Sequence, residues 1–308
     1  MADTNLTDWL LETKIHSIRY LTMRHLLDKA EDDPDVQSII RQQMAATGPI
    51  PQILAQQTDA GRWQGEHSYY TPKYTSTHWS MMLLAELDVD ADDQRFQKGI
   101  EFMLSDTEER MEKALKSGEE YGLLCFWGNM LRYVFHGNKF DDPRIETIIH
   151  YIERDALRKE WRCPYNDGLP CSWGVARTLW GLAFLPDEYR TPLIRQVIEN
   201  GLTFLMESYQ LVEADYPFKG KISKLWSKLN FPLFYQTDIL FVLRVLKDFD
   251  ALDHPGAKPA LAWLEARRKA NGRWQGASPY GSRTWDGMRI DKQDTSRWVS
   301  LHAAMILK

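Results

Sequence analysis

The sequence of 308 residues predicts an all-α fold in which helices alternate between an inner and an outer layer. No segment shows the strict alternation of apolar and polar residues that indicates a β-strand. Segments that are apolar throughout alternate with amphipathic segments along the chain, as buried helices alternate with helices that face solvent. The pentapeptide Gly-Arg-Trp-Gln-Gly also occurs twice, at 61–65 and at 272–276, which indicates an internal repeat.

The repeat extends to the segments that flank the pentapeptide. Each copy leads into a loop rich in Tyr, Ser, Thr and Pro, and then into an apolar helix that opens with Thr-Ser, at 75–76 and at 295–296. A degenerate third copy lies at 160–163. We therefore expect the repeated unit to be a helix, a long loop and a second helix.

The six apolar segments carry few charges on any face, and they are predicted to be inner helices that are buried all round. In chain order they are 14–28, 75–87, 124–135, 171–185, 234–247 and 295–307. The amphipathic segments are predicted to be outer helices, and most begin at a capping residue or at a Pro in the first turn. They are 5–12, 33–46, 92–104, 141–154, 191–208 and 254–270, and the charged stretch 106–120 is expected to be a mobile or loosely helical linker.

Six inner and six outer helices close into a ring, an α/α toroid, which forms one domain over residues 1–308. Connections from inner to outer helices are short and acidic, whereas those from outer to inner helices (47–74, 155–170, 209–232 and 271–294) are long and aromatic. Since the inner helices run parallel, all long loops and all inner-helix N-termini lie at one end, which we name the long-loop end. The partial positive charge of those N-termini is expected to favour an anionic or electron-rich ligand there.

The composition excludes several classes of function. The net charge of −5 argues against nucleic acid as a partner, because phosphate binding needs a basic face. No run of 18 apolar residues occurs, so no transmembrane segment is expected. The first residues lack the pattern of a signal peptide and the three Cys have no disulfide-framework spacing, so a cytoplasmic location is expected. The oligomeric state stays open.

Two sets of residues resemble known families. The Gly-Arg-Trp-Gln repeats resemble the Gln-Trp repeats of squalene-hopene cyclases. The stretches 231–238 and 296–302 are similar to bacterial proteins described as squalene-cyclase-like or prenyltransferase-like. This resemblance covers the whole chain and implies the toroid of the terpenoid cyclase and protein prenyltransferase superfamily. It also implies a terpenoid-cyclase-like enzyme that acts on an isoprenoid or similar apolar substrate in a central aromatic cavity, by acid–base or carbocation chemistry.

One acidic motif matches the family pattern but lies at the wrong end of the ring. The motif Asp90-Ala91-Asp92-Asp93 matches the Asp-x-Asp-Asp acid of class II terpene cyclases, whose central Asp protonates an alkene or an epoxide. Here it stands in a short inner-to-outer turn, away from the long loops, and 141–142 supplies the same acids in the next turn. Helix capping explains both pairs, so we do not assign the motif to catalysis.

A better candidate for the acid is Asp238, which lies at the start of an inner helix at the long-loop end. Tyr235 precedes it by three residues and shares its face. An aspartate among apolar neighbours is desolvated, which raises its pKa as a general acid requires. The alternative is a capping Asp that is bonded to its own backbone.

The remaining candidate residues are polar groups on inner helices and aromatic residues of the loops. His78 and His302 are further catalytic candidates. The candidate substrate-binding residues are Tyr70, Tyr74, Trp127, Asn129, Trp173, Gln236, Trp285 and Arg297. Trp63 and Trp274 are expected to join neighbouring repeats. Lysines between 219 and 228 form either a solvated loop or, with arginines of the 271–294 loop, a binding site for phosphate or carboxylate.

A zinc site would have to be assembled from Cys163, Asp167, Cys171 and His302. Protein prenyltransferases hold zinc with an Asp and a Cys two residues apart and a His, whereas Asp167 and Cys171 are four residues apart. Buried cysteine is also commonly a small apolar side chain. We therefore expect no cofactor and no metal.

Two alternatives to a terpenoid-cyclase-like enzyme stay open. The first is a carbohydrate-active lyase or glycosidase, with Asp286, Asp291 and Asp294 as the carboxylates. The second is a ligand-binding or scaffold protein without catalysis. The lack of the second helical domain of squalene cyclases and of a well-placed Asp-x-Asp-Asp motif weakens the terpenoid-cyclase hypothesis. The residues do not identify the substrate or decide whether the protein is an enzyme.

Overall fold

The computed structural model describes residues 4–44, 48–64, 68–117, 123–209, 211 and 222–308, and within them the chain is all-helical. The β pairings in these ranges are limited to two isolated bridges. None of the helices there combines the length and the apolar character that crossing a bilayer requires.

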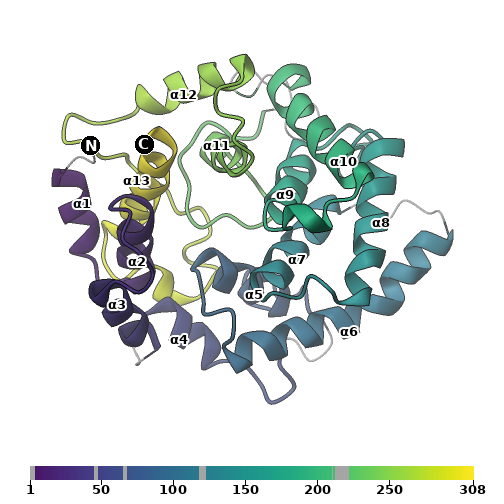
Figure 1. Ribbon diagram of the computed structural model, residues 1–308, viewed down its shortest axis with the longest axis horizontal. Helices are drawn as coiled ribbons and strands as arrows, with labels where there is room; N and C mark the ends of the chain where they lie inside the picture. The colour runs from purple at the N-terminus through teal and green to yellow at the C-terminus, as the bar shows by residue number, and fades with distance from the viewer. Residues whose placement is uncertain (1–3, 45–47, 65–67, 118–122, 210, 212–221) are drawn as a thin grey trace.

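Figure 1 shows the helices arranged as a two-layered ring. The inner helices are α2 (His16–His25), α5 (Thr77–Glu86), α7 (Leu124–His136), α9 (Ser172–Leu182), α11 (Ile239–Asp248) and α13 (Asp294–Leu307). The outer helices are α1 (Thr4–Leu11), α3 (Pro34–Met44), α4 (Pro49–Leu54), α6 (Gln94–Ser117), α8 (Pro143–Arg158), α10 (Pro192–Thr203) and α12 (Lys258–Glu265). Inner helices pack side by side in the order α5, α7, α9, α11, α13 and α2. The arrangement is consistent with the expected α/α toroid.

Burial follows the two-layer pattern that the sequence predicts. Every residue of α9 and nine of the ten residues of α5 are buried. The outer helix α8 instead buries a stripe that includes Ile145, Ile148 and Ile152, at the helical spacing of three to four residues. The apolar segments therefore form the inner layer because they have no face that suits water.

The helices differ from the sequence prediction most clearly in three places, α4, α6 and α11. Helix α4 lies in a stretch expected to be loop because of Pro49 and Pro51, yet Pro in the first helical turn sacrifices no hydrogen bond. Helix α6 runs through most of the expected linker to Ser117, since its Glu, Lys, Arg and Met residues favour helix, and 118–120 lie outside the described residues. Helix α11 begins only at Ile239, after an extended residue that caps it.

The two copies of the pentapeptide make the same hydrogen bonds. The indole N–H of Trp63 donates to the carbonyl of Ile53 (2.6 Å), and that of Trp274 donates to the carbonyl of Leu264 (2.8 Å). The backbone N–H of each Trp donates to a hydroxyl of the following inner helix, on α5 or α13. Both indoles are buried, so each Trp joins the outer helix to the inner helix of its own repeat. The expected link between neighbouring repeats stays a prediction.

The ring is closed by contacts between its first and last helices. The Thr13 hydroxyl, in the turn after α1, donates to the carboxylate of Asp294 (2.8 Å), and the Trp9 indole donates to Gln293 (2.8 Å). The guanidinium of Arg297 donates to the backbone carbonyl of Trp9 (3.2 Å). Figure 1 shows α1 and α13 side by side, so the two ends of the described chain meet in one wall of the ring.

Candidate functional site

Two cavities lie at opposite ends of the inner helices α5 and α7. One, of about 580 Å³, is at the long-loop end and is reached by residues that precede α5 and by the first turn of α7. The other, of about 440 Å³, is at the end where α5 and α7 finish, and its lining includes Asp88 and His136. We name them the long-loop cavity and the acidic cavity.

The long-loop cavity is built from segments of four different connections. Its lining consists of Ser68, Tyr69, Tyr70, Thr71, Lys73, Leu123, Cys125, Phe126, Cys163, Tyr165, Asn166, Cys171, Trp173 and Tyr235. The segments 68–73, 163–171 and 235 belong to long loops, and the others to helix starts. The sequence prediction that a site lies at the long-loop end therefore corresponds to a real cavity there.

Aromatic rings form much of the wall of this cavity. The ring of Tyr70 lies 6.1 Å from that of Phe126, and the ring of Tyr235 lies 6.1 Å from that of Trp173, measured between centroids. The ammonium of Lys73 lies over both tyrosine rings, 4.8 Å from the centroid of Tyr235 and 5.7 Å from that of Tyr70. Burial raises the pKa of Tyr70, so its hydroxyl stays neutral.

The electrostatics of the cavity favour electron-rich groups. Lys73 is the charged side chain among the described lining residues, and no carboxylate accompanies it. Leu123 and Cys171 are the N-caps of α7 and α9, so the unpaired N–H groups of two inner helices also meet at the cavity. An anionic or electron-rich ligand at this end stays a prediction.

Three of the residues predicted for the site, Tyr70, Trp173 and Tyr235, line the long-loop cavity. His78 lies directly behind its wall, with its ring stacked 4.4 Å from that of Phe126 and its Nδ1 3.3 Å from the hydroxyl of Tyr133. Burial lowers the pKa of His78 to about 3, so the imidazole is neutral.

The other predicted binding residues do not line this cavity, and they take part in packing or hydrogen bonds elsewhere. Two of them pack on aromatic rings: Tyr74 on Phe234 and Tyr280, and Trp127 on Tyr151. Three form hydrogen bonds: Asn129 donates to the carbonyl of Phe234, the backbone carbonyl of Gln236 accepts from Arg177, and Trp285 donates to the hydroxyl of Ser80. Arg297 forms ion pairs with Asp291 and Asp294. His302 is buried against the rings of Phe231 and Trp298. Lys219 and Lys221 of the basic loop lie outside the described residues.

Asp238 is buried beneath the surface and functions as the N-cap of α11. Its Oδ1 accepts from the backbone N–H of Phe241 (2.8 Å), and its Oδ2 accepts from the backbone and side-chain N–H groups of Asn230 (2.9 and 2.8 Å). Burial raises its pKa to about 6, against the effect of these donors. The carboxylate borders a void of only about 10 Å³ and not the long-loop cavity, which is the geometry of the capping alternative.

The proposed zinc ligands are only partly brought together. Cys163 and Cys171 both line the long-loop cavity, while His302 lies on α13. Among the described residues, no group of three or more His, Cys, Asp or Glu side chains is placed to hold a metal ion.

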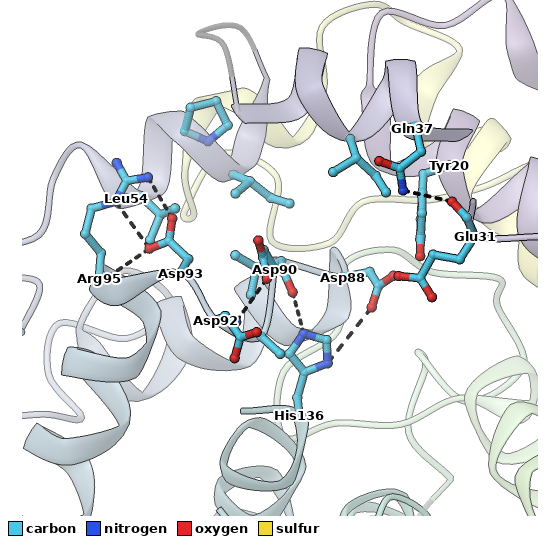
Figure 2. A pocket seen from close by; sticks show the side chains of 15 residues that line it. Tyr20, Glu31, Gln37, Leu54, Asp88, Asp90, Asp92, Asp93, Arg95 and His136 are labelled. Atoms are coloured by element: carbon cyan, nitrogen blue, oxygen red, sulfur yellow. Dashed lines mark hydrogen bonds and ion pairs between the residues drawn. The ribbon is translucent and has the colours of Figure 1, made fainter. Parts of the chain in front are cut away.

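The acidic cavity contains the motif that resembles the cyclase acid (Figure 2). Oδ1 of Asp93 accepts from the backbone N–H groups of Arg95 (2.8 Å) and Phe96 (3.2 Å), and Asp142 accepts from the N–H of Arg144. Helix capping by the second Asp of each pair is therefore confirmed. The cavity beside the motif was not expected, because it needs His136 and residues from the segment 20–54 that are far away in sequence.

Several lining residues were missed, and a simple signal would have found some of them. Lys73 and Cys163 stand in the long loops, and Cys125 and Phe126 in the first turn of an inner helix, where Trp127 was selected instead. Phe126 lines the cavity and Trp127 does not, because successive side chains of a helix point about 100° apart. Cys163 was considered only as a zinc ligand.

Comparison with known proteins gives no match: no protein-family model, no curated protein and no solved structure is similar to the chain. The all-helical ring and its buried aromatic residues are compatible with an α/α toroid. The terpenoid-cyclase resemblance thus has no support beyond the residues that suggested it.

Proposed function

We propose that the protein binds an apolar, isoprenoid-like small molecule in the long-loop cavity, with an anionic group of the ligand beside Lys73. The observation that carries the proposal is a cavity of about 580 Å³ with aromatic walls, one ammonium group and no carboxylate among its described lining residues. Small-molecule sites typically measure about 300–1,000 Å³ and combine apolar walls with a few polar groups that set orientation.

The position of Lys73 supports an anionic head group. Its ammonium lies between the rings of Tyr70 and Tyr235, where cation–π attraction holds it in place. The N-termini of α7 and α9 add N–H donors and partial positive charge on the same cavity. A ligand with a phosphate or carboxylate at one end and a hydrocarbon chain at the other fits both features.

The proposal concerns binding in the first place, since the terpenoid-cyclase reading requires an acid at the substrate. No carboxylate is among the described residues that line the cavity, and the oxygens of Asp238 already accept three hydrogen bonds. The carbohydrate alternative has the same difficulty, because Asp291 and Asp294 pair with Arg297. The family resemblance therefore supports only the class of ligand in this proposal. Aromatic walls suit an isoprenoid whether or not the protein also catalyses a reaction.

Calorimetric titration with farnesyl diphosphate and with farnesol tests the proposal. We expect both to bind, with the diphosphate about tenfold tighter, which corresponds to about 1.4 kcal/mol for one favourable charge contact. Lys73→Gln should remove the difference between the two ligands, while Tyr235→Ala should weaken both. Lys258→Gln, a loss of the same charge on the exposed start of α12, should change neither.

Two results would overturn the proposal. The first is a wild-type protein that binds neither ligand, tested at concentrations at which both compounds are monomeric and soluble and bind to a control isoprenoid-binding protein. The second is equal affinity of the wild type and Tyr235→Ala for both ligands.

A further inference from the structure

All three cysteines of the chain line the long-loop cavity. They come from different segments: Cys125 from the first turn of α7, Cys163 from the loop that follows α8, and Cys171 from the N-cap of α9. All three are free thiols, and Cys171 is more buried than the other two. The fold thus places all three thiols of the chain at one cavity without a disulfide between them.

A short antiparallel pairing brings Cys163 and Cys171 to the same side of their loop. The N–H of Cys163 donates to the carbonyl of Leu169 (3.0 Å), and the N–H of Cys171 donates to the carbonyl of Trp161 (2.9 Å). Side chains alternate between the two faces of such a pairing, so the two cysteines share a face. The two thiols thereby come close enough for each to shift the pKa of the other.

The surroundings divide the three thiols into one acidic and two inert groups. The hydrogen bond from Cys171, with backbone N–H groups of Tyr165, Leu123 and Asn166, lowers the pKa of Cys163 to about 6. The same hydrogen bond and burial raise the pKa of Cys171, and burial raises that of Cys125 to about 12. At neutral pH, Cys163 is the thiolate, which is the nucleophilic form.

The described lining of the cavity contains no carboxylate that would oppose this thiolate. The other titratable groups in this lining are the thiols of Cys171 and Cys125, the hydroxyls of four tyrosines and the ammonium of Lys73. A cation and helix N-termini stabilise a thiolate. The cavity also gives a reagent access to Cys163, which is partly exposed.

We propose that Cys163 is a nucleophilic thiol that reacts with small disulfides entering the long-loop cavity, and that Cys171 then displaces the adduct to form a Cys163–Cys171 disulfide. In the first step the Cys163 thiolate attacks one sulfur of the reagent, a new S–S bond forms, and half of the reagent leaves as a thiolate. In the second step Cys171 loses its proton to solvent and attacks the Cys163 sulfur, which releases the other half as a thiolate. The protein is oxidised by two electrons, and the disulfide reagent is reduced to two thiols.

The geometry assigns a different role to each cysteine. Cys163 attacks because it is ionised and accessible, and Cys171 resolves because it is buried in contact with Cys163 and protected from the reagent. Cys125 takes no part, since burial keeps it protonated. This reactivity goes beyond ligand binding and does not depend on the class of ligand proposed above.

The test uses dithiobis(nitrobenzoate), an anionic aromatic disulfide whose released thiolate is coloured. At pH 6 about half of Cys163 is ionised, against well under 1% of an ordinary thiol with a pKa of about 8.5. The weaker nucleophilicity of a low-pKa thiolate offsets roughly tenfold of that advantage. Wild-type protein should therefore react about tenfold faster at pH 6 than a free cysteine peptide, and intact mass should show loss of two hydrogens and no adduct.

Single variants separate the three roles. Cys163→Ser should lose the fast reaction, Cys171→Ser should stop at a stable adduct on Cys163, and Cys125→Ser should behave as the wild type. Circular dichroism checks that each variant is folded, and peptide mapping of oxidised wild type identifies the bonded pair without any variant. A wild type that keeps its adduct, a mapped bond between other cysteines, or a folded Cys163→Ser that reacts at the wild-type rate would overturn the proposal.

The same proteins separate this inference from the proposed function. Cys163→Ser should still bind farnesyl diphosphate, because serine leaves the aromatic walls and Lys73 unchanged. Prior binding of that ligand should slow the thiol reaction by covering Cys163. Reaction without any ligand binding would leave the thiol chemistry standing and remove the isoprenoid proposal.

Discussion

Helices α7 and α9 pack so closely at Gly128 that a methyl group there should destabilise the ring. A Cβ at position 128 would lie 2.3 Å from the carbonyl oxygen of Arg177 and 2.5 Å from the Cα of Thr178. Gly181 faces the same contact from α9, where a Cβ would lie 2.3 Å from the carbonyl oxygen of Gly128. The obstructing atoms belong to the backbone, so no side-chain rotation relieves the overlap.

The expected magnitude of Gly128→Ala combines two opposing effects. Ordinary contacts of a Cβ begin at about 3.4 Å, so the two helices must move apart by roughly 1 Å. Overpacking of a core costs about 1–3 kcal/mol, and a purely backbone obstruction belongs at the upper limit of that range. Alanine is the better helix former by about 1 kcal/mol, so the net loss of stability should be about 2 kcal/mol.

Thermal unfolding followed by circular dichroism measures this loss. The unfolding entropy of a chain of this length makes 1 kcal/mol equivalent to roughly 1.5 °C, so Tm should fall by about 3 °C. Gly174→Ala, in the first turns of α9, is the matched control, because the nearest atom to its Cβ is the Leu124 Cβ at 3.5 Å. It should leave Tm unchanged or raise it. If Gly128→Ala were as stable as the wild type, or if both variants lost stability equally, the close-packing argument would be refuted.

Other substitutions test the pentapeptides, the acidic motif and the buried acid. Trp63→Phe and Trp274→Phe should each lower the free energy of unfolding by about 1–3 kcal/mol, since each removes a buried indole hydrogen bond and part of a buried ring. Unequal losses in urea unfolding would contradict equivalent roles. Asp93→Ala should lower the free energy of unfolding by about 1 kcal/mol because it removes a helix cap, and Asp92→Ala should change it by no more than about 0.5 kcal/mol. Loss of ligand binding by either folded variant would place the binding site at the acidic cavity instead of the long-loop cavity. Between pH 4 and 6 the raised pKa of Asp238 keeps its carboxyl protonated in the folded protein, whereas the same carboxyl in the unfolded chain releases its proton. The free energy of unfolding of the wild type should therefore fall as pH rises through that window, by up to about 3 kcal/mol. Asp238→Asn should lack this pH dependence.

The sequence predicts the helical layers well because burial and capping leave direct marks on it. Helix α9 contains a single charged residue, Arg177, and Pro143 follows a capping Asp142, so both helices could be located from the sequence. Helix α4 was not predicted because a proline such as Pro49 can either interrupt a helix or stand in its first turn. Which of the two applies depends on packing against distant segments, such as the contact of α4 with Asp286–Met288.

The end of the ring that holds the predicted site was predictable, but most of its residues were not. Chain direction alone places the long loops together, and Tyr70, Trp173 and Tyr235 follow from that rule. The rule cannot decide which residue of a helix turn faces the cavity, as Phe126 shows. Nor can it show that Cys163 meets Cys171, because their contact depends on backbone pairing within an irregular loop.

The acids of this protein illustrate a more general limit. A carboxylate at the start of a helix is equally suited to cap it or to donate a proton, and its neighbours in sequence do not distinguish the two. The number of N–H donors around it does: Asp238 accepts three hydrogen bonds and Asp93 accepts two from backbone, so both are already occupied by the fold. The described lining of the long-loop cavity contains a thiolate-forming cysteine and an ammonium in place of a carboxylate. Chemistry at this cavity should therefore be sought among reactions of a nucleophilic thiolate with an electrophile and among anionic ligands attracted by Lys73, because no carboxylic acid is among the described lining residues.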